Sequence, residues 1–197
     1  MIKEPLLINT PFPIKTERLI LRPMMPGDGK ILFNLVEESR DALGEWLPWV
    51  SSVKTEVDSE KNACEFYAQF ILKKAFRFLI FHNDLLVGGC SLHKIDWNIP
   101  SAGIGYYCHK LHQNNGYIFE AVTALIFYGF HQLGLRRITI ICDDENIKSA
   151  RVAEKLGFML ESKAKGLISK PGNNELRVSR CYVRFDIKGL EKHKVAW

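Results

Sequence analysis

The chain has 197 residues, of which 47% are hydrophobic and 25% are charged, as in an average soluble globular domain. These proportions exclude a collagen, a coiled coil and a wholly disordered chain. A chain of this length buries about 70% of its unfolded surface, so it needs no disulfide framework or structural metal. The net charge of +5 favours anionic ligands such as nucleotides without predicting direct nucleic-acid binding.

The cysteines and the N-terminal residues indicate a reducing compartment. The five cysteines are widely spaced, form no CxxC pair and do not cluster with histidine at zinc-site spacing. We therefore expect free thiols and no metal site. Residues 1–13 lack the apolar run of a signal peptide, and no stretch approaches the roughly 20 apolar residues that span a bilayer. A cytoplasmic protein with no membrane association is the expectation.

The first half of the chain predicts helices and strands in alternation. Three prolines remove backbone donors near the N-terminus, and a turn with Asp28 as a plausible cap precedes the first helix. The triplet at 82–84 joins two β-rich runs as a hairpin. The expected elements are an extended lead-in over 1–15, a strand over 18–22, a helix through 31–36, a helix over 54–74, and strands over 76–81 and 85–93.

The second half predicts two helix–strand units and a final hairpin. The Gly- and Asn-bearing residues 171–174 form the loop of that hairpin. The expected elements are strands over 102–108 and 137–142, helices over 116–133 and 147–156, a strand beginning near 158, and a strand over 177–185. The order predicts the mixed α/β class with no domain boundary.

The most informative segment is residues 105–118, where a strand runs through a polar turn directly into a long helix. A helix start offers unpaired backbone N–H groups and a positive dipole end, which together bind phosphate oxygens. Gly116 allows close approach of the backbone, and Asn114 and Asn115 tolerate turn geometry without adding negative charge. An ordinary strand–turn–helix connection is the alternative.

A second strand-to-helix junction lies within residues 142–158. Asn146 has the position of an N-cap, Ser149 lies on the first turn, and Gly157 ends the helix. Local structure accounts for most of this pattern. Two polar junctions of this kind in one α/β sheet nevertheless indicate a ligand crevice at the strand ends.

These segments together resemble the GNAT superfamily of acetyl-CoA-dependent N-acetyltransferases, and within it the RimJ/RimL type that acetylates ribosomal-protein N-termini. The motifs that carry the resemblance lie at residues 16–23, 43–49, 103–107, 113–118, 135–137 and 146–158. Ile118 departs from the family's small residue. The resemblance implies a central, mostly antiparallel twisted sheet with a parallel splay for pantetheine, flanked by helices. It assigns residues 16–188 to this domain and leaves 189–197 as a tail.

The resemblance also implies roles for individual residues. Ser149 matches a hydroxyl residue near the thioester sulfur and is the better candidate proton donor to the leaving thiolate. Cys142 is a second candidate donor, and a buried inert thiol is its alternative. The residues that match positions for acetyl-CoA are Tyr107, Cys108, Gln113, Asn114, Asn115, Gly116, Tyr117, Ile118, Asn146 and Ser149.

The general base is where the sequence departs from the family. Members often carry a glutamate just before the Ile-Gly-Tyr of the central strand, and this chain has Gly103 there. His93, with Asp96, is a candidate substitute acting through a water, because histidine titrates near neutral pH. A surface histidine with a turn aspartate is the alternative, and so is proton loss to solvent without a dedicated base.

The acceptor pocket is assigned to an aromatic segment. Trp46 and Trp49 are candidates to wall it, and Glu45 is a candidate to hold an ammonium group, with core packing and an exposed loop carboxylate as the alternatives. The implied reaction is acetyl transfer to a protein N-terminal α-amine. A small-molecule amine acceptor (polyamine or antibiotic) and a catalytically silent CoA-binding module are the other hypotheses. A homodimer through residues 177–185 and a covered strand edge remain open.

Overall fold

The computed structural model describes residues 4–170, 175–190 and 193–197. Within these residues, eight strands form one sheet in the order β1-β2-β3-β4-β5-β6-β8-β7. Neighbouring strands are antiparallel except β5 and β6, which run parallel. The strands are β1 (Ile14–Lys15), β2 (Ile20–Pro23), β3 (Phe76–His82), β4 (Leu85–Asp96), β5 (Ser101–Cys108), β6 (Arg137–Asp143), β7 (Met159–Ser169) and β8 (Leu176–Arg184).

Four α-helices flank the sheet, so the expected mixed α/β class is confirmed for the described part of the chain. The α-helices are α1 (Gly29–Gly44), α2 (Glu56–Ile71), α3 (Tyr117–Phe127) and α4 (Ile147–Lys155). Short helical turns also occur at η1 (Pro5–Leu7), η2 (Pro48–Ser52), η3 (Lys110–His112) and η4 (Tyr128–Gln132), the last of which continues α3 as a π-helical turn.

The sheet opens between its two parallel strands. Pairing of β5 with β6 ends at Ile104 and Ile140, although β5 continues to Cys108 and β6 to Asp143. Beyond the last pair, the facing backbone groups of the two strands have no ladder partners in each other. The expected parallel splay is therefore confirmed, and it offers strand edges to an extended ligand.

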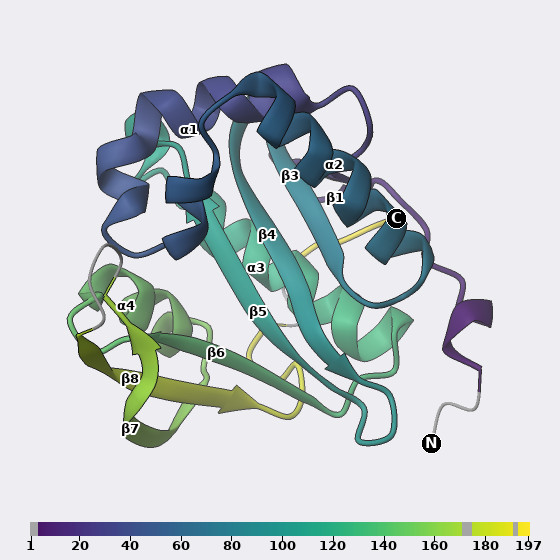
Figure 1. Ribbon diagram of the computed structural model, residues 1–197. Coiled ribbons are helices and arrows are strands. Elements are labelled where there is room, and N and C mark those ends of the chain that lie inside the picture. The colour runs from purple at the N-terminus through teal and green to yellow at the C-terminus, as the bar shows by residue number, and fades with distance from the viewer. Residues whose placement is uncertain (1–3, 171–174, 191–192) are drawn as a thin grey trace.

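The helices form two layers, one on each face of the sheet (Figure 1). Ala102 and Ile104 of β5 pack into the main core with α3 and α4. Side chains alternate between the two faces along a strand, so Gly103 and Gly105 occupy positions that belong to the opposite face. Tyr107 on that opposite face packs into a second cluster with α1. Consecutive residues of β5 thus contact different clusters on the two faces of the sheet.

Local sequence signals account well for the ends of α2 and for the first hairpin. Thr55 accepts a hydrogen bond from the Asp58 amide, and the Asp58 carboxylate reaches back to the Thr55 amide, which is a capping box. Asn83 and Asp84 adopt φ of 47° and 63° between β3 and β4. Both residue types tolerate this left-handed conformation in a two-residue hairpin turn.

The predicted cap of the first helix is wrong in its mechanism. Asp28 occupies the N-cap position of α1, but its side chain makes no capping hydrogen bond there. Its carboxylate instead accepts bonds from Arg22 at 2.6 and 2.7 Å and from the Met25 amide at 2.7 Å. A neighbouring arginine competes successfully for the carboxylate because the charged pair forms the stronger bond.

Strand β1 and the C-terminal residues lie side by side at one edge of the sheet. Ile14 is fully buried in β1, and Lys15 forms an isolated bridge with Ala196. At the other end of the sheet, β8 lies between β6 and β7. Of the two alternatives for residues 177–185, the covered edge is therefore the one found. The predicted hairpin of β7 and β8 is present, and its loop at 171–174 lies outside the described residues.

Candidate active site

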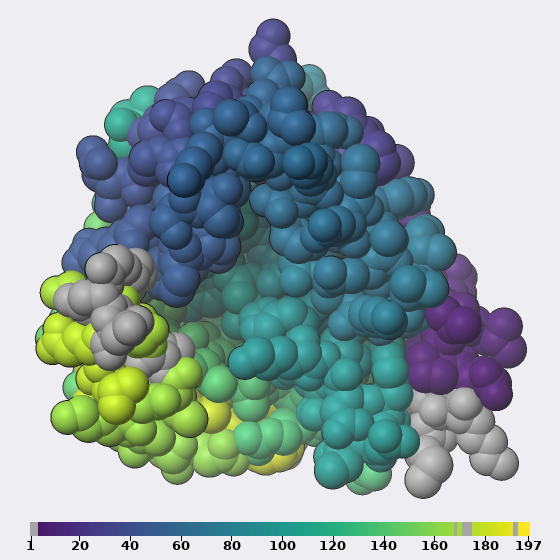
Figure 2. Space-filling view, viewed as in Figure 1, coloured from purple at the N-terminus to yellow at the C-terminus, as the bar shows by residue number. Residues whose placement is uncertain are grey.

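A cavity of about 680 Å³ lies at the splay of β5 and β6. Its walls come from the end of α1, the loop that follows it, β5, β6, the start of α3, and α4. Figure 2 shows the corresponding face of the molecule hollowed between the α1–α2 segment and the central strands. The cavity therefore joins the two polar strand-to-helix junctions that the sequence singled out.

The first junction is built to bind an anion. Gly116 takes the N-cap position of α3 with φ of 78° and provides no side-chain cap, so the first amides of α3 keep free N–H groups. Asn114 also has a positive φ, of 65°. The Asn115 side chain donates bonds to two carbonyls of its own loop, at His112 and Gln113. The loop is thus held in shape by its own hydrogen bonds, next to the uncapped start of α3.

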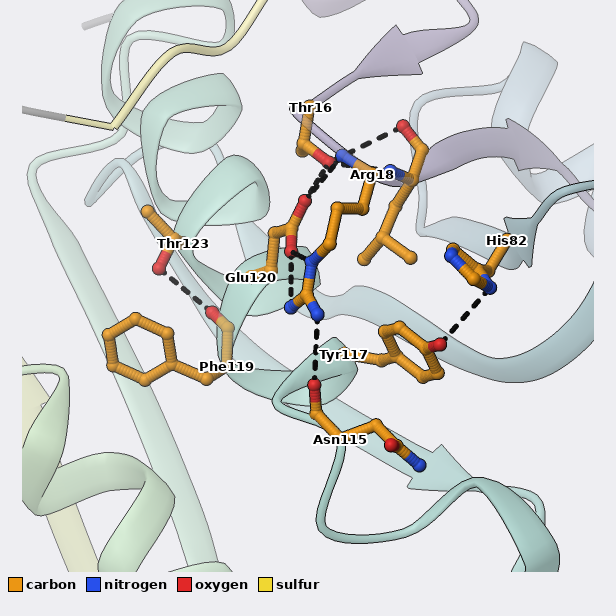
Figure 3. Close-up of polar contacts among 9 residues, drawn as sticks. Thr16, Arg18, His82, Asn115, Tyr117, Phe119, Glu120 and Thr123 are labelled. Carbon is orange, nitrogen blue, oxygen red and sulfur yellow. Dashed lines mark hydrogen bonds and ion pairs between the residues drawn. The ribbon is translucent and has the colours of Figure 1, made fainter.

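An arginine fixes this helix start from outside the cavity (Figure 3). Arg18 forms an ion pair with Glu120 at 2.7 Å and donates a bond to the Asn115 carbonyl at 3.1 Å. Although burial opposes ionisation, hydrogen bonds from Thr16 and Arg18 hold the pKa of Glu120 below its usual value. The only acidic residue in the first turn of α3 is therefore neutralised by a cation, and its charge does not oppose an anion.

The second junction brings two hydroxyl groups together. Asn146 Oδ1 accepts a hydrogen bond from the Ser149 amide at 3.0 Å, which is the expected N-cap of α4. Ser149 Oγ lies 2.8 Å from the hydroxyl of Tyr106, and the same hydroxyl donates to the Ser149 carbonyl. Burial raises the pKa of Tyr106, so its hydroxyl stays protonated. A fixed proton donor pair faces the cavity.

Cys142 lies beside this pair at the end of β6. Its side chain is buried and contributes to the cavity wall. Burial raises the pKa of the Cys142 thiol, although a hydrogen bond with Ser149 opposes the shift. The group is therefore a thiol rather than a thiolate at neutral pH.

Sequence reasoning missed Tyr106 and the cations of α4. Tyr106 lies within the family motif at residues 103–107, which assigns it no role, whereas alternation along the strand places its side chain toward α4. A helical-spacing search would have found the cations. They are Lys148, Arg151 and Lys155, all of which line the cavity on one face of α4. Lys148 Nζ also donates to Gln113 Oε1 at 3.0 Å, which links α4 to the anion-binding loop.

The two tryptophans of the aromatic segment, Trp46 and Trp49, lie in different surroundings. Trp46 lines the cavity, and the guanidinium of Arg177 lies 5.3 Å from the centre of its ring. Asp143 holds Arg177 through an ion pair of 2.7 Å. Trp49 contacts Tyr107 edge-on at 5.4 Å and is not among the residues that line this cavity. Glu45 is exposed at the rim.

His93 lies on the other face of the sheet from Ser149. It pairs with Gly103 across β4 and β5, and a Cβ at Gly103 would approach His93 Nε2 to 3.1 Å. Ser91 Oγ lies 3.2 Å from His93 Nδ1. Burial, assisted by the charges of Lys94 and Arg77, lowers the pKa of His93 to about 4, so the imidazole is neutral at pH 7. The missing side chain at Gly103 leaves room for this ring.

Most of the predicted site residues converge on one cavity, and four do not line it. Asp96, considered together with His93, instead accepts two backbone hydrogen bonds of a turn. Asn115 acts through its loop bonds, and Trp49 and His93 lie outside the lining. The predicted residues that line the cavity are Glu45, Trp46, Tyr107, Cys108, Gln113, Asn114, Gly116, Tyr117, Ile118, Cys142, Asn146 and Ser149.

These features together define a class of site. Free helix-start amides and a row of cations suit a phosphate-bearing ligand. The adjoining splay offers backbone groups to an extended chain, and the hydroxyl pair of Tyr106 and Ser149 lines the same cavity. An elongated phosphorylated carrier with its reactive end near Ser149 fits this arrangement.

Comparison with known proteins places the chain in a family. A profile described as the acetyltransferase (GNAT) domain matches residues 18–159. The ribosomal-protein-serine acetyltransferase of Escherichia coli (strain K12) is 32% identical over 146 residues, which cover 74% of this chain and 82% of that protein. The chain therefore belongs to the GNAT acetyltransferase family and is an N-acetyltransferase, as the sequence resemblance predicted.

Solved structures agree with this assignment. A RimL ribosomal L7/L12 α-N-protein acetyltransferase in complex with coenzyme A aligns with a TM-score of 0.83 at 24% identity, over 87% of this chain and 96% of that one. A GNAT-family acetyltransferase from Bacillus anthracis aligns with a TM-score of 0.72 at 29% identity, over 87% and 97% of the two chains. The predicted GNAT fold is confirmed.

No helix in the described part of the chain is long and apolar enough to cross a membrane. Among the same residues, no cluster of three or more His, Cys, Asp or Glu side chains could hold a metal ion.

Proposed function

We propose that this chain transfers the acetyl group of acetyl-CoA to the α-amino group of a protein N-terminus. The observation that carries the proposal is the single cavity that joins an anion-binding helix start to the Ser149–Tyr106 hydroxyl pair. The similarity to a ribosomal-protein-serine acetyltransferase supports a protein acceptor. A reducing, cytoplasmic setting fits such an acceptor and the free thiols.

The residues present fit CoA along its length. The amides at the start of α3 would bind the pyrophosphate, and Lys148, Arg151 and Lys155 would neutralise the remaining phosphate charge. The free edge of β5 beyond Ile104 would pair with the amide groups of the pantetheine arm. Asn146 shapes the start of α4 so that Ser149 faces the reactive end.

Acetyl-CoA supplies an activated acetyl group as a thioester. Ser149 donates a proton to the departing sulfur, and Tyr106 supports this because its hydroxyl is bonded to Ser149 Oγ and stays protonated. The C–N bond forms as the C–S bond breaks, and one proton passes in total from nitrogen to sulfur. The reaction therefore needs no external proton source. Cys142 remains a second donor candidate beside Ser149.

His93 is assigned to the acceptor side of the sheet. With a pKa of about 4, it is too weak a base to hold the proton of an alkylammonium group at neutral pH. Its neutral imidazole can accept a hydrogen bond from the amine or from a bridging water. Ser91 would orient the ring for this role. Trp46 and Glu45 would wall the route by which the acceptor enters.

The test combines calorimetric titration with acetyl-CoA and a free-thiol release assay on the same preparation. Peptides that begin with Ser or Ala are compared with spermidine, and the same peptides with a blocked amine serve as controls. Peptide-dependent release supports the proposal. Release with spermidine alone would make the chain a small-molecule acetyltransferase, and tight binding without release would make it a silent module.

A further inference from the structure

One arginine lies on the acceptor face of the sheet, the face that carries His93, and has no acidic partner among the described residues. Arg77 on β3 lies in register with Ser91 on β4, and Ser91 lies in register with Gly105 on β5. Since paired residues share a face, these three positions form a row across the sheet, and His93 lies on the same face. The row ends at Gly105 of β5. This is the first residue beyond Ile104, where the pairing of β5 with β6 stops.

The guanidinium of Arg77 is held by neutral groups. It lies 4.0 Å from the centre of the Phe66 ring and donates to Gln69 Oε1 at 2.6 Å. Both partners come from α2, so the head group is fixed without losing its charge. A guanidinium has five N–H donors, and Gln69 accepts one of them.

No carboxylate of the described residues forms an ion pair with Arg77, although its side chain is partly buried. Arg22, Arg177 and Arg180 are also partly buried, and each has an aspartate within 2.7 Å. Burial lowers the pKa of Arg77, because no anion compensates the removal of the cation from water. A shielded cation fixed in this way is suited to an incoming anion.

We propose that Arg77 binds a carboxylate of the acceptor, so that preferred acceptors are peptides with Asp or Glu at the second or third residue. This inference rests on the proposed function, since it places the reacting amine at the splay near Gly105. Strands β5 and β3 are two strand spacings, or about 10 Å, apart. An extended peptide spans about 3.3–3.6 Å per residue, so the third residue lies about 7 Å from the first, and its side chain together with that of Arg77 covers the rest of the separation.

The charges near His93 agree with an acidic acceptor. Besides burial, the charges of Lys94 and Arg77 lower the pKa of His93, and both of these neighbours are cationic. A polyamine would bring further positive charges to the same place, whereas a carboxylate beside the reacting amine would offset them. The same surface thus favours an acidic peptide over a polycation.

The test uses pairs of peptides that differ in one functional group. A Ser-starting peptide with Asp at position 2 or 3 is compared with the same peptide carrying Asn, and with one carrying Asp at position 6. For the native chain we expect about tenfold higher kcat/KM for the acidic member at position 2 or 3, mostly through KM. At position 6 the preference should vanish.

The variant Arg77→Met should lower kcat/KM for the acidic peptide about tenfold more than for its amide partner. Arg136→Met, at an exposed arginine outside the cavity lining, serves as the matched control and should keep the preference. Acetyl-CoA affinity and melting temperature report whether the variants remain folded. If Arg77→Met does not fold, the peptide pairs on the native chain still decide the question.

Two results would overturn the inference while leaving the proposed function intact. One is equal kcat/KM for acidic and amide peptides on the native chain. The other is an equal loss for both peptides in Arg77→Met, which would mark Arg77 as a structural residue. Absence of acetylation with every peptide would instead contradict the proposed function itself.

Discussion

Gly116 combines a positive φ with a place at the mouth of the cavity. In Gly116→Asp, a carboxylate would occupy the space where the α3 amides meet phosphate, so we expect acetyl-CoA affinity to fall at least about tenfold. Gly189→Asp is the control, because Gly189 has a similar φ of 80° and lies outside the cavity lining. Calorimetry on both variants separates backbone strain from loss of the anion site. Equal affinity in Gly116→Asp and the native chain would contradict the assignment of the loop.

Among the described residues that line the cavity, Ser149 and Tyr106 form a hydroxyl pair with a distance of 2.8 Å between the two oxygens. Ser149→Ala removes the proton donor and should lower kcat about 10- to 100-fold, with a much smaller change in KM for acetyl-CoA. Tyr106→Phe should have a weaker effect of the same kind. Ser162→Ala, at an exposed serine of β7, is the control. An unchanged kcat in Ser149→Ala would move the role to Cys142.

His93 links stability to pH because its pKa is lowered to about 4 in the folded chain, against about 6.5 when unfolded. Between these values the unfolded chain binds more protons, so stability is full above about pH 6.5 and falls as the pH drops toward 4. At about pH 5 the loss amounts to at most about 2 kcal/mol. Urea unfolding of the native chain and of His93→Gln should show a smaller pH dependence in the variant. Parallel curves would contradict the buried, neutral imidazole.

At the scale of elements, the N-terminal strand region holds the start of α3 through Arg18 and Glu120 (Figure 3). Arg18→Ala removes the contacts to Glu120 and to the Asn115 carbonyl, so the anion-binding loop loses an external support. We expect acetyl-CoA to bind several-fold more weakly. Arg18 is 44% exposed, so the ion pair itself contributes about 1 kcal/mol or less to folding.

A double-mutant cycle of Arg18→Ala and Glu120→Gln checks this prediction, with acetyl-CoA affinity and urea unfolding as readouts. The two substitutions should be non-additive in affinity, because both act through the same loop. Arg18→Lys keeps the charge but not the forked geometry, and it should restore only part of the affinity. Additive effects would show that Arg18 and Glu120 act on separate features.

Elements specified by neighbouring residues could be predicted from the sequence. The capping box at Thr55 and the left-handed turn at Asn83 and Asp84 depend on residues close in the chain, and both appear where the pattern indicates. Gly116 at the start of α3 is of the same kind. Asp28 failed as a cap because Arg22, on a different element, competes for its carboxylate. Such competition is decided by packing and leaves no local pattern.

The sequence predicts those parts of the candidate site whose residues are contiguous in the chain. The loop before α3 and the start of α4 are contiguous motifs, so both were found. Tyr106 meets Ser149 only because β5 and α4 pack together, 43 positions apart in the chain. Trp46 and Arg177 meet by the same kind of distant contact. Register and face, which decide such contacts, are set by the whole sheet.

At the scale of the whole molecule, the sheet has two halves, β1 to β5 and β6 to β8. They are joined only where residues 101–104 of β5 pair with residues 137–140 of β6. The cavity takes residues from both halves, since it includes the start of α3 on one side and α4 on the other. Lys148 and Gln113 form a direct contact across the opening. A ligand in the splay therefore adds contacts between halves that share few backbone bonds.

Acetyl-CoA should consequently stabilise the molecule as a unit. At about 100 times its Kd, a ligand that binds only the folded chain adds about 2.7 kcal/mol, which raises Tm by about 5–10 °C for a chain of this size. Hydrogen exchange should slow both at residues 105–108 of β5 and at residues 141–143 of β6, because the ligand covers the strand edges left open beyond Ile104 and Ile140. Gly116→Asp at the same concentration should show a smaller rise in Tm and weaker protection, because its lower affinity reduces the stabilisation by the ligand. Protection confined to one half would place the ligand outside the splay, and in that case the cavity, the hydroxyl pair and the row that ends at Arg77 would no longer share one reaction centre.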